Sequence, residues 1–270
     1  MSAEELSSPG ACGPAAQSAA QWFAKTEEIH RRIRETQMAN VAAAAETIAQ
    51  SIMSDRMVHL FGAGHGSLPV MECYPRIGGF VGYHPMTEHC LSYFTNVVGD
   101  SGVPQFLFLE RLEGFAQVIL QNYRLDPRDT MMIFSQSGIN GVVVDMALET
   151  KRQGLTVIAL TSLEHTMSVS PRHSSGKRLC EIADIVVDTC VPAGDAMIEI
   201  PGLKEKVGPG STFGFVTAVN AINCEVARLL TERGHPPLVN ISHNLLPPDE
   251  AEKQMAKVWE AYLEKIKSRV

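Results

Sequence analysis

The sequence contains no Cys-x-x-Cys pair, and its six cysteines are scattered along the chain. Zinc-ribbon spacing is absent, and in a chain of 270 residues these cysteines do not suggest a disulfide framework. We interpret the cysteines as reduced and structural. Cysteines of that kind are typical of a cytoplasmic protein.

The sequence also lacks an excess of positive charge. Its 23 Lys and Arg residues face 30 Asp and Glu residues, which gives a net charge of −7. Nucleic acid is therefore excluded as the main partner, because phosphate backbones attract basic surfaces. No run reaches the about 18 apolar residues of a membrane span, and the N-terminus lacks the basic start and apolar core of a secretory signal. We expect no membrane contact.

The composition is that of an ordinary globular protein. Of the 270 residues, 45% are hydrophobic and 20% are charged, enough for a sizeable core. Residues 1–17 are rich in Ala, Gly, Ser and Pro and are predicted to be a disordered tail. Residues 18–270 are predicted to form a single domain.

Apolar periodicity predicts alternating strands and helices after a long N-terminal helix over 19–53. That alternation is typical of a parallel sheet covered by helices on both faces, in which ligands bind beyond the carboxyl ends of the strands. The strands are expected at 57–61, 80–86, 129–135, 156–162 and 183–190, and the further helices at 67–79, 108–125, 140–155, 211–234 and 249–268, with a polar loop over 164–178.

The loop "FGAGHGSLP" (61–69) follows the first of these strands. Its glycines let a ligand approach the backbone, and Ser67 stands where the next helix begins, a position that favours anions. A dinucleotide site would need glycine in place of Ser67 and an acidic residue near position 82, and both are missing. A tight turn without a ligand remains an alternative.

The loop "FSQSGIN" (134–140) follows the strand over 129–135 and offers two hydroxyls, an amide, a glycine and Asn140. A helix N-cap needs only one such group. Several together suit a phosphate or a sulfonate, whose oxygens accept several hydrogen bonds. The loop has no lysine, so it is not a P-loop, and Gly-x-Ser-x-Gly is missing, which disfavours a serine nucleophile.

The segment "DTMMIFSQSGINGVVVDMALETKRQGLTVIALT" (129–161) resembles the core of the SIS (sugar isomerase) domain. That family has a strand, a Ser-x-Ser-Gly-x-Ser/Thr loop, a helix ending in Lys-x-x-Gly and a strand ending in Thr. The resemblance covers about residues 20–245. The matching positions are Ser135, Ser137, Gly138, Asn140 (where Ser or Thr is usual), Lys151, Gly154 and Thr161.

The chain is most similar to the phosphoheptose-isomerase-like single-domain branch. That branch has a Gly-x-Gly-His start, a Glu and an Arg on the next helix, and an Arg-His-Ser-Ser-Gly-Lys loop. Here these are Gly64-His65, Glu72, Arg76 and "RHSSGKRL" (172–179). The resemblance implies a flavodoxin-like three-layer αβα sandwich, phosphosugar-like ligands, and homodimers or homotetramers with shared active sites.

Aldose–ketose isomerisation through an enediol needs a base that moves a proton between adjacent carbons. On the resemblance and this need, Glu72 is the favoured base and His65 a candidate acid. Arg76, four residues after Glu72, is either a substrate ligand or one half of a surface salt bridge.

Three further residues, His84, Glu88 and His89, follow the second predicted strand. A His/Glu cluster allows a metal, but no tight ligand spacing supports one. We predict no metal and no cofactor.

Glu225 lies in the apolar stretch "VNAINCEVARLL", so it is either paired with Arg228 or functional with a raised pKa. His243 is a second candidate from the C-terminal region. The loop with Arg172, His173 and Lys177 either closes over an anionic substrate or is simply solvated.

We therefore predict an isomerase of a small phosphorylated or sulfonated sugar. Asn140 has an amide where the family usually has a short hydroxyl. We therefore consider a sulfonate as well as a phosphate as the anion of the sugar. A non-catalytic sugar-phosphate-binding protein and a SIS-type sugar lyase or deaminase remain alternatives. The catalytic candidates are Glu72, His65, Glu225 and His243, and the substrate-binding candidates are Gly64, Ser67, Arg76, Ser135, Gln136, Ser137, Gly138, Asn140, Arg172, His173 and Lys177.

Overall fold

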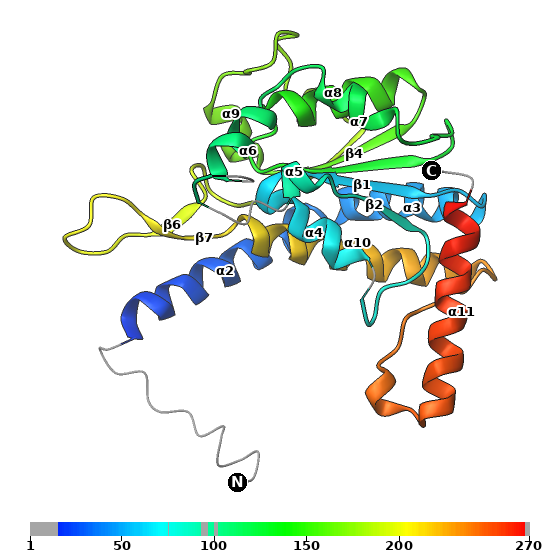
Figure 1. The fold of residues 1–270 in the computed structure, drawn as a ribbon. Coiled ribbons are helices and arrows are strands. Elements are labelled where there is room, and N and C mark those ends of the chain that lie inside the picture. The colour runs from blue at the N-terminus through cyan, green and yellow to red at the C-terminus, as the bar shows by residue number, and fades with distance from the viewer. Residues whose placement is uncertain (1–15, 75, 93–96, 100–101, 268–270) are drawn as a thin grey trace.

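The computed structural model describes residues 16–74, 76–92, 97–99 and 102–267. Its centre is a parallel five-stranded sheet in the order β2-β1-β3-β4-β5. Helices lie above and below this sheet, which makes three layers (Figure 1). The strands are β1 Val58–Gly62, β2 Tyr83–Met86, β3 Thr130–Phe134, β4 Thr156–Thr161 and β5 Ile185–Asp188.

Different helices cover the two faces of the sheet. The long helices α3 and α10 cover one face together with the short α4, and α7 and α8 cover the other. The remaining helices lie at the ends and edges of the sandwich. The helices are α2 Gln17–Thr36, α3 Met38–Met53, α4 Ser67–Cys73, α5 His89–Ser92, α6 Val103–Leu109, α7 Phe115–Leu120, α8 Gly141–Arg152, α9 Leu163–Ser168, α10 Ser211–Glu232 and α11 Pro248–Ile266.

The central strand β3 shows why the sheet is buried on both sides. Met132 and Phe134 pack in the cluster under α3 and α10, whereas Met131 and Ile133 pack in the cluster under α7 and α8. All four side chains have no exposed surface. A strand covered on both faces has no polar side, so it reads as a continuous apolar run.

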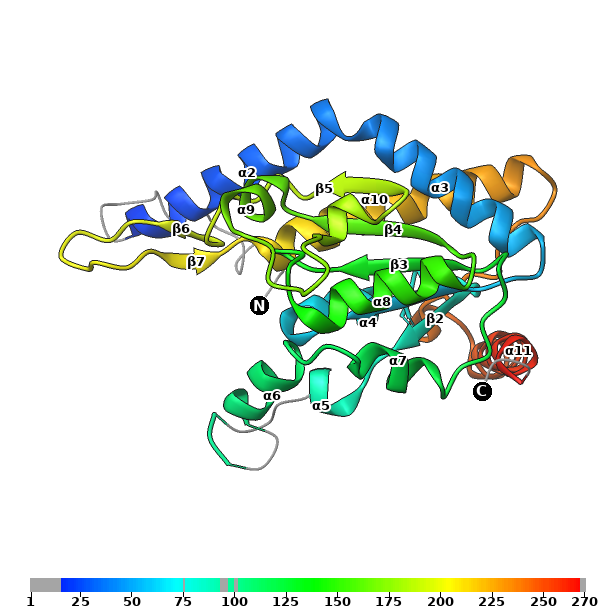
Figure 2. The same cartoon turned by 90° about the horizontal axis from the view of Figure 1, so that it is seen from above.

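The register aligns the carboxyl ends of the strands. Phe61 of β1 pairs with Ile133 of β3, and Ile133 pairs with Ala159 of β4. The loops that follow these three strands therefore meet at one edge of the sheet, on the left in Figure 2. The predicted flavodoxin-like sandwich with a central parallel sheet is confirmed.

The predicted N-terminal helix over 19–53 is two helices that meet at Gln37. Gln37 is buried, and its side-chain oxygen accepts a hydrogen bond of 3.0 Å from the Asp188 N–H at the end of β5. This contact explains the break, because it ties the helix junction to the sheet. The predicted tail over 1–17 lies outside the described residues up to position 15, and α2 begins at Gln17.

Other boundaries were predicted wrongly. The single helix expected over 108–125 is split into α6 and α7, because Gly114 has a φ of 87° and ends helical continuity. The predicted polar loop over 164–178 begins with α9. A hairpin of β6 Ala196–Ile198 and β7 Val207–Pro209, absent from the prediction, projects beside α2 (Figure 2).

Helix α10 is long and apolar enough to cross a membrane by length and composition, which the scan for apolar runs did not anticipate. In the structure its apolar face packs on α3 and the sheet, through residues such as Phe215, Val219 and Ile222. This is the environment of a core helix. The described cysteines are all free: Cys73, Cys90, Cys180, Cys190 and Cys224.

Candidate anion-binding site

The loop after β3 turns sharply at the carboxyl edge of the sheet. The Ser135 N–H donates to the Leu160 carbonyl at 3.1 Å, which continues the pairing with β4. The Ser135 hydroxyl accepts a hydrogen bond of 3.1 Å from the Gly138 N–H and so closes the turn. The Ser137 side chain makes no hydrogen bond to any described residue and remains available to a ligand.

Gly138 is required at this turn for two reasons. Its φ of 63° lies in the left-handed region that side chains disfavour. A Cβ at this position would also lie 3.2 Å from Leu179 Cβ and 3.3 Å from Thr161 Oγ1. The loop therefore depends on glycine for both its conformation and its packing.

The N-terminus of α8 opens directly onto this loop. Its N-cap residue, Asn140, makes no side-chain capping hydrogen bond. Free N–H groups and the helix dipole at such an end favour an anion. Of the other helices that begin at this edge, α9 is capped by the Ser162 hydroxyl, and α10 by the Asp195 carboxylate, which accepts from the Ser211 N–H at 2.7 Å.

The amide of Gln136 is the least satisfied group of the loop. Both of its polar atoms are buried, and neither has a hydrogen-bond partner among the described residues. The same holds for Nδ1 of His165 and Oγ1 of Thr189, which follow β4 and β5. A buried polar group left unpaired costs about 1–3 kcal/mol, so these groups are suited to a ligand with several donors and acceptors.

Asn140 links the loop to two charged side chains. Its side-chain oxygen accepts a hydrogen bond from the Arg172 guanidinium. Its side chain also lies near the carboxyl of Glu110, the residue after α6, and acts to lower the pKa of that carboxyl. Burial raises the pKa of Glu110, although Arg111, Asn140 and Arg172 oppose that rise. The amide that departs from the family pattern is thus held by neighbours within the chain.

The basic loop after α9 is fastened to α8 by His173. Its Nε2 lies 3.0 Å from an oxygen of the buried Asp145, and its Nδ1 lies 2.8 Å from the Ser175 hydroxyl. The Ser174 N–H donates to Glu113 at 2.8 Å, and these hydrogen bonds from Ser174 lower the pKa of Glu113. His173, a predicted substrate ligand, therefore has both ring nitrogens engaged within the chain.

The other two predicted residues of this loop face solvent. Arg172 is exposed and reaches Asn140, which brings its positive charge to the start of α8. Lys177 is also exposed. The structure thus brings Arg172 together with the Ser135–Asn140 loop and leaves Lys177 on the outer side of the loop.

The glycine loop after β1 is packed tightly. Gly64 has a φ of 59°, and a Cβ there would meet the Phe106 ring at 2.6 Å. The Ser67 hydroxyl is buried and donates to the Gly64 carbonyl at 2.7 Å. His65 is exposed on the turn. Ser67 therefore closes this turn in the way Ser135 closes the next one.

Glu72, the predicted base, lies near the end of α4. Its carboxylate accepts hydrogen bonds from Arg76 and, at 3.0 Å, from the Asn220 side chain of α10. Glu72 and Arg76 line a cavity of about 250 Å³ between α4, α10 and residues 77–80. No described residue of the Ser135–Asn140 loop lines this cavity, so the structure does not bring the two predicted groups together within one chain.

The two C-terminal candidates also lie apart from the loop. Glu225 is on the outer side of α10 and pairs with Arg228, 31% of its side chain being exposed. The hydrogen bond from Arg228 lowers the pKa of Glu225, so of the two alternatives for this residue the structure shows the pairing with Arg228 and not a raised pKa. His243 lies in a 3-10 turn before α11, with its Nε2 buried and unpartnered among the described residues.

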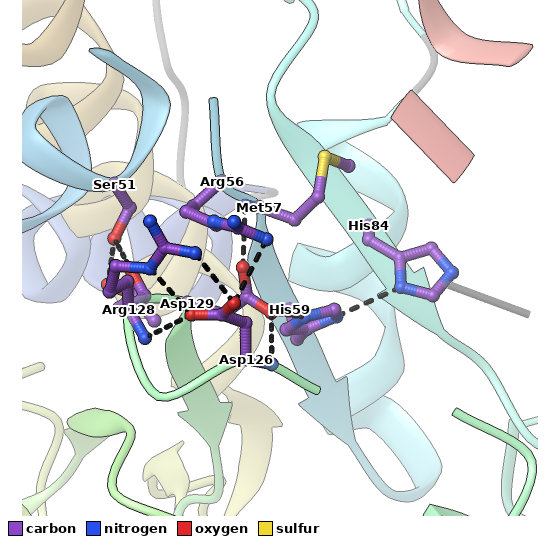
Figure 3. Close-up of polar contacts among 9 residues, drawn as sticks. Ser51, Arg56, Met57, His59, His84, Asp126, Arg128 and Asp129 are labelled. Atoms are coloured by element: carbon purple, nitrogen blue, oxygen red, sulfur yellow. Dashed lines mark hydrogen bonds and ion pairs between the residues drawn. The ribbon is translucent and has the colours of Figure 1, made fainter. Parts of the chain in front are cut away.

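A buried polar chain crosses the other half of the sheet (Figure 3). His59 of β1 lies 2.9 Å from His84 of β2 through their Nδ1 atoms, and its Nε2 lies 3.2 Å from Asp129. Asp129 also accepts from the amides of Met57 and Asp126, at 3.1 and 2.8 Å. Burial raises the pKa of Asp129, but these hydrogen bonds together outweigh burial and lower it.

Two of the three possible metal ligands of the sequence make contacts within the chain. His84 is paired with His59, and Glu88 accepts from the Tyr123 hydroxyl at 3.2 Å. Among the described residues, no group of three or more His, Cys, Asp or Glu side chains is arranged to hold a metal ion.

Comparison with known proteins identifies the family. The model of the SIS domain matches residues 21–162 of this chain. The chain belongs to the SIS domain family. A UPF0309 protein of Oceanobacillus iheyensis is 32% identical over 246 residues, which cover 91% of this chain and 97% of the relative. A UPF0309 protein of Caldanaerobacter subterraneus is 33% identical over 247 residues, covering 89% and 97%.

Among solved structures, this SIS protein is similar to the phosphoheptose isomerase GmhA from Neisseria gonorrhoeae. The TM-score is 0.51 at 14% sequence identity, and the match covers 78% of this chain and 97% of that one. At this identity the likeness shows the fold alone. The family resemblance drawn from residues 129–161 is confirmed.

Sequence reasoning missed Glu110, Asp145, His59 and Asp129. Asp145 lies in the predicted helix over 140–155, just after Val142 and Val144. These apolar neighbours were the only sign in the sequence that Asp145 is buried. His59 stands within a strand of apolar residues, which was a similar sign. Glu110 carried no such sign, because "LERLEG" reads as a solvated helix face.

Proposed function

We propose that this SIS protein is an aldose–ketose isomerase of a small sugar that carries a phosphate or a sulfonate. The proposal rests on one observation above all. The Ser135–Asn140 loop combines a helix N-terminus without a side-chain cap, the available Ser137 hydroxyl and the buried, unpartnered amide of Gln136. An anion and a neighbouring hydroxyl of one ligand would satisfy these groups together.

Each group has a distinct part in this proposal. The N–H groups of Gly141 and Val143 and the Ser137 hydroxyl would donate to the anion, since the Val142 N–H already donates to the Glu110 carbonyl. Arg172 would supply positive charge nearby. The Gln136 amide offers both a donor and an acceptor, the pair that a sugar hydroxyl also offers. Ser135 and Ser67 support the turns, because their hydroxyls already make hydrogen bonds within the chain.

The isomerisation requires a base close to the carbon-bound proton. Glu72 is the base that the sequence predicts, and it lies in the cavity between α4 and α10. A ligand on the Ser135–Asn140 loop would have to extend to that cavity, or the loop and the cavity would have to come from different chains of an oligomer. Glu72 is therefore tested below together with Glu110, the carboxyl beside Asn140.

Deuterium exchange tests the reaction. The protein is incubated in deuterated water with aldose and ketose phosphates and sulfonated sugars, and the proton signals at carbons 1 and 2 are followed by NMR. We expect exchange with at least one sugar of the panel and no exchange with its unphosphorylated or unsulfonated form. Binding without exchange for every sugar would reject the isomerase and favour a binding protein.

Ser137→Ala is expected to weaken binding of the exchanging sugar by about 10- to 100-fold, because a hydrogen bond to a charged group contributes about 1.5–3 kcal/mol. Isothermal titration calorimetry measures the effect. Ser168→Ala on the exposed end of α9 is the control, since the Ser168 hydroxyl bonds only to the His165 carbonyl. Equal affinities of the Ser137→Ala and wild-type proteins would remove Ser137 from the anion site.

A further inference from the structure

We propose that Glu110 transfers the carbon-bound proton of the ligand held on the Ser135–Asn140 loop. This inference rests on the proposed function and names its catalytic carboxyl. Glu110 ends α6, outside every motif that carries the family resemblance. Three features of its place in the fold support the assignment.

The first feature is the docking of the Glu110 segment on the start of α8. The Val142 N–H donates to the Glu110 carbonyl at 3.1 Å. A Cβ on Gly141 would lie 2.6 Å from the Arg111 carbonyl oxygen, so only glycine permits this approach. The backbone of Glu110 is thus fixed against the helix end that borders the anion loop.

The second feature is the direction of the side chain. The Glu110 carboxyl lies close enough to Asn140, the last residue of the loop, for the Asn140 side chain to oppose the rise in its pKa. Arg172 contacts the same Asn140 from the basic loop. Glu110 is only partly buried, so its carboxyl, at the Asn140 end of the loop, is open to a ligand.

The third feature is electrostatic. Burial raises the pKa of Glu110 above that of an ordinary glutamate, despite the opposing effects of Arg111, Asn140 and Arg172. A carboxyl whose pKa moves toward the working pH can both take and return a proton. Glu113, three residues later, differs, because its hydrogen bonds from Ser174 lower its pKa and hold it ionised.

The chemical step balances with this one carboxyl and solvent. Ionised Glu110 takes the proton from carbon 2 of the open-chain aldose. The electron pair of that C–H bond forms the double bond between carbons 1 and 2, while the carbonyl π pair moves to oxygen 1. Oxygen 1 gains a proton from water and the hydroxyl on carbon 2 loses one to water. Glu110 then returns its proton to carbon 1, which gives the ketose.

The test compares variants on a sugar that the wild-type protein exchanges. We expect Glu110→Gln to slow exchange by about 10²- to 10⁴-fold, the usual contribution of a positioned acid–base group, with ligand affinity within a few-fold of the wild-type value. Glu110→Asp should restore part of the rate. Glu149→Gln is the control, because Glu149 pairs with Arg152 further along α8.

The pH profile separates catalysis from a purely structural role. Because the ionised form of Glu110 is the base, the exchange rate of the wild-type protein should rise with pH through the raised pKa of this carboxyl, above the about 4.3 of a free glutamate. In Glu110→Asp this limb should move, and in Glu149→Gln it should stay. A merely structural Glu110 would leave the limb in place.

The outcomes distinguish the two proposals. No exchange by the wild-type protein with any sugar rejects the isomerase itself. Exchange by the wild-type protein that persists at full rate in Glu110→Gln overturns the inference about Glu110 alone. Exchange that is lost in Glu72→Gln and kept in Glu110→Gln assigns the base to Glu72, which also overturns the inference.

Discussion

Asp129→Asn is expected to lower the free energy of unfolding by about 1–3 kcal/mol at neutral pH, the usual cost of leaving a buried hydrogen-bonding group unsatisfied. Asp129 accepts hydrogen bonds from the His59 ring and from the amides of Met57 and Asp126. An asparagine side chain has one acceptor and one donor group. Its NH₂ group would face at least one N–H donor in a site where Asp129 is 1% exposed.

The substitution also disturbs the histidine pair. With Asp129 ionised, His59 Nε2 carries the proton that it donates, so a neutral His59 accepts at Nδ1 from Nδ1–H of His84. If Asp129 no longer fixes this tautomer, two buried rings lose their matched donor and acceptor. The substitution would therefore disturb hydrogen bonds that link the start of β3 to β1 and β2 (Figure 3).

Urea unfolding followed by circular dichroism measures this effect, with Asp249→Asn as the control. Asp249 is exposed on α11, 4.0 Å from Lys253, so its substitution should change stability by no more than about 0.5 kcal/mol.

The folded-state pKa of Asp129 is lowered, so its stabilisation is fully present above the unfolded pKa of about 3.9 and is lost as the pH falls through the folded pKa. The difference in the free energy of unfolding between the wild-type protein and Asp129→Asn should therefore shrink over that acidic range. A neutral-pH loss no larger than that of Asp249→Asn would refute this account of the buried chain.

Gly138→Ala is expected to weaken binding of a sugar phosphate by about 100-fold or more, equivalent to about 2.7 kcal/mol. Alanine at a φ of 63° costs about 1–2 kcal/mol, and its Cβ would press on Leu179 and Thr161. The loop relieves both strains by leaving the left-handed conformation. The Gly138 N–H then moves away from Ser135, and the donors of the loop no longer converge.

Gly234→Ala is the matched control for this change. Gly234 also has a positive φ, of 77°, but nothing lies within 4 Å of a Cβ added there. Both variants therefore pay the conformational cost, while only Gly138→Ala alters the loop. Calorimetric titration measures the affinity of both variants for the same sugar phosphate. Similar affinities in the two variants would mean that the loop does not hold the anion.

The sequence allowed the sheet to be predicted because its strands are short apolar runs bounded by glycine and polar residues. The segment from β3 to β4 is the best example, since both strands are buried on both faces and α8 ends near Gly154. The division between α6 and α7 was missed because an interior glycine in a periodic pattern does not reveal a φ of 87° at Gly114. The β6–β7 hairpin was missed because its strands have three residues each.

The candidate site was predicted only in part, for physical reasons that particular residues show. The Ser135–Asn140 loop is local, so its donors are visible in sequence order. The sequence left two alternatives open for Glu225, because residues adjacent in sequence point to different sides of a helix. In the structure its apolar neighbours face the core while Glu225 pairs with Arg228. Glu110 is near Asn140, thirty positions later, and only the packing of residues 110–111 against the start of α8 reveals this.

An NMR titration of the ¹⁵N-labelled protein with inorganic phosphate tests the central claim most directly, because it reports on each backbone amide of the anion loop. We predict that the largest shift changes fall on residues 136–141, and that Gly138→Ala abolishes them while Gly234→Ala keeps them. Shift changes centred instead on the cavity of Glu72 and Arg76, with residues 136–141 unaffected, would contradict the account.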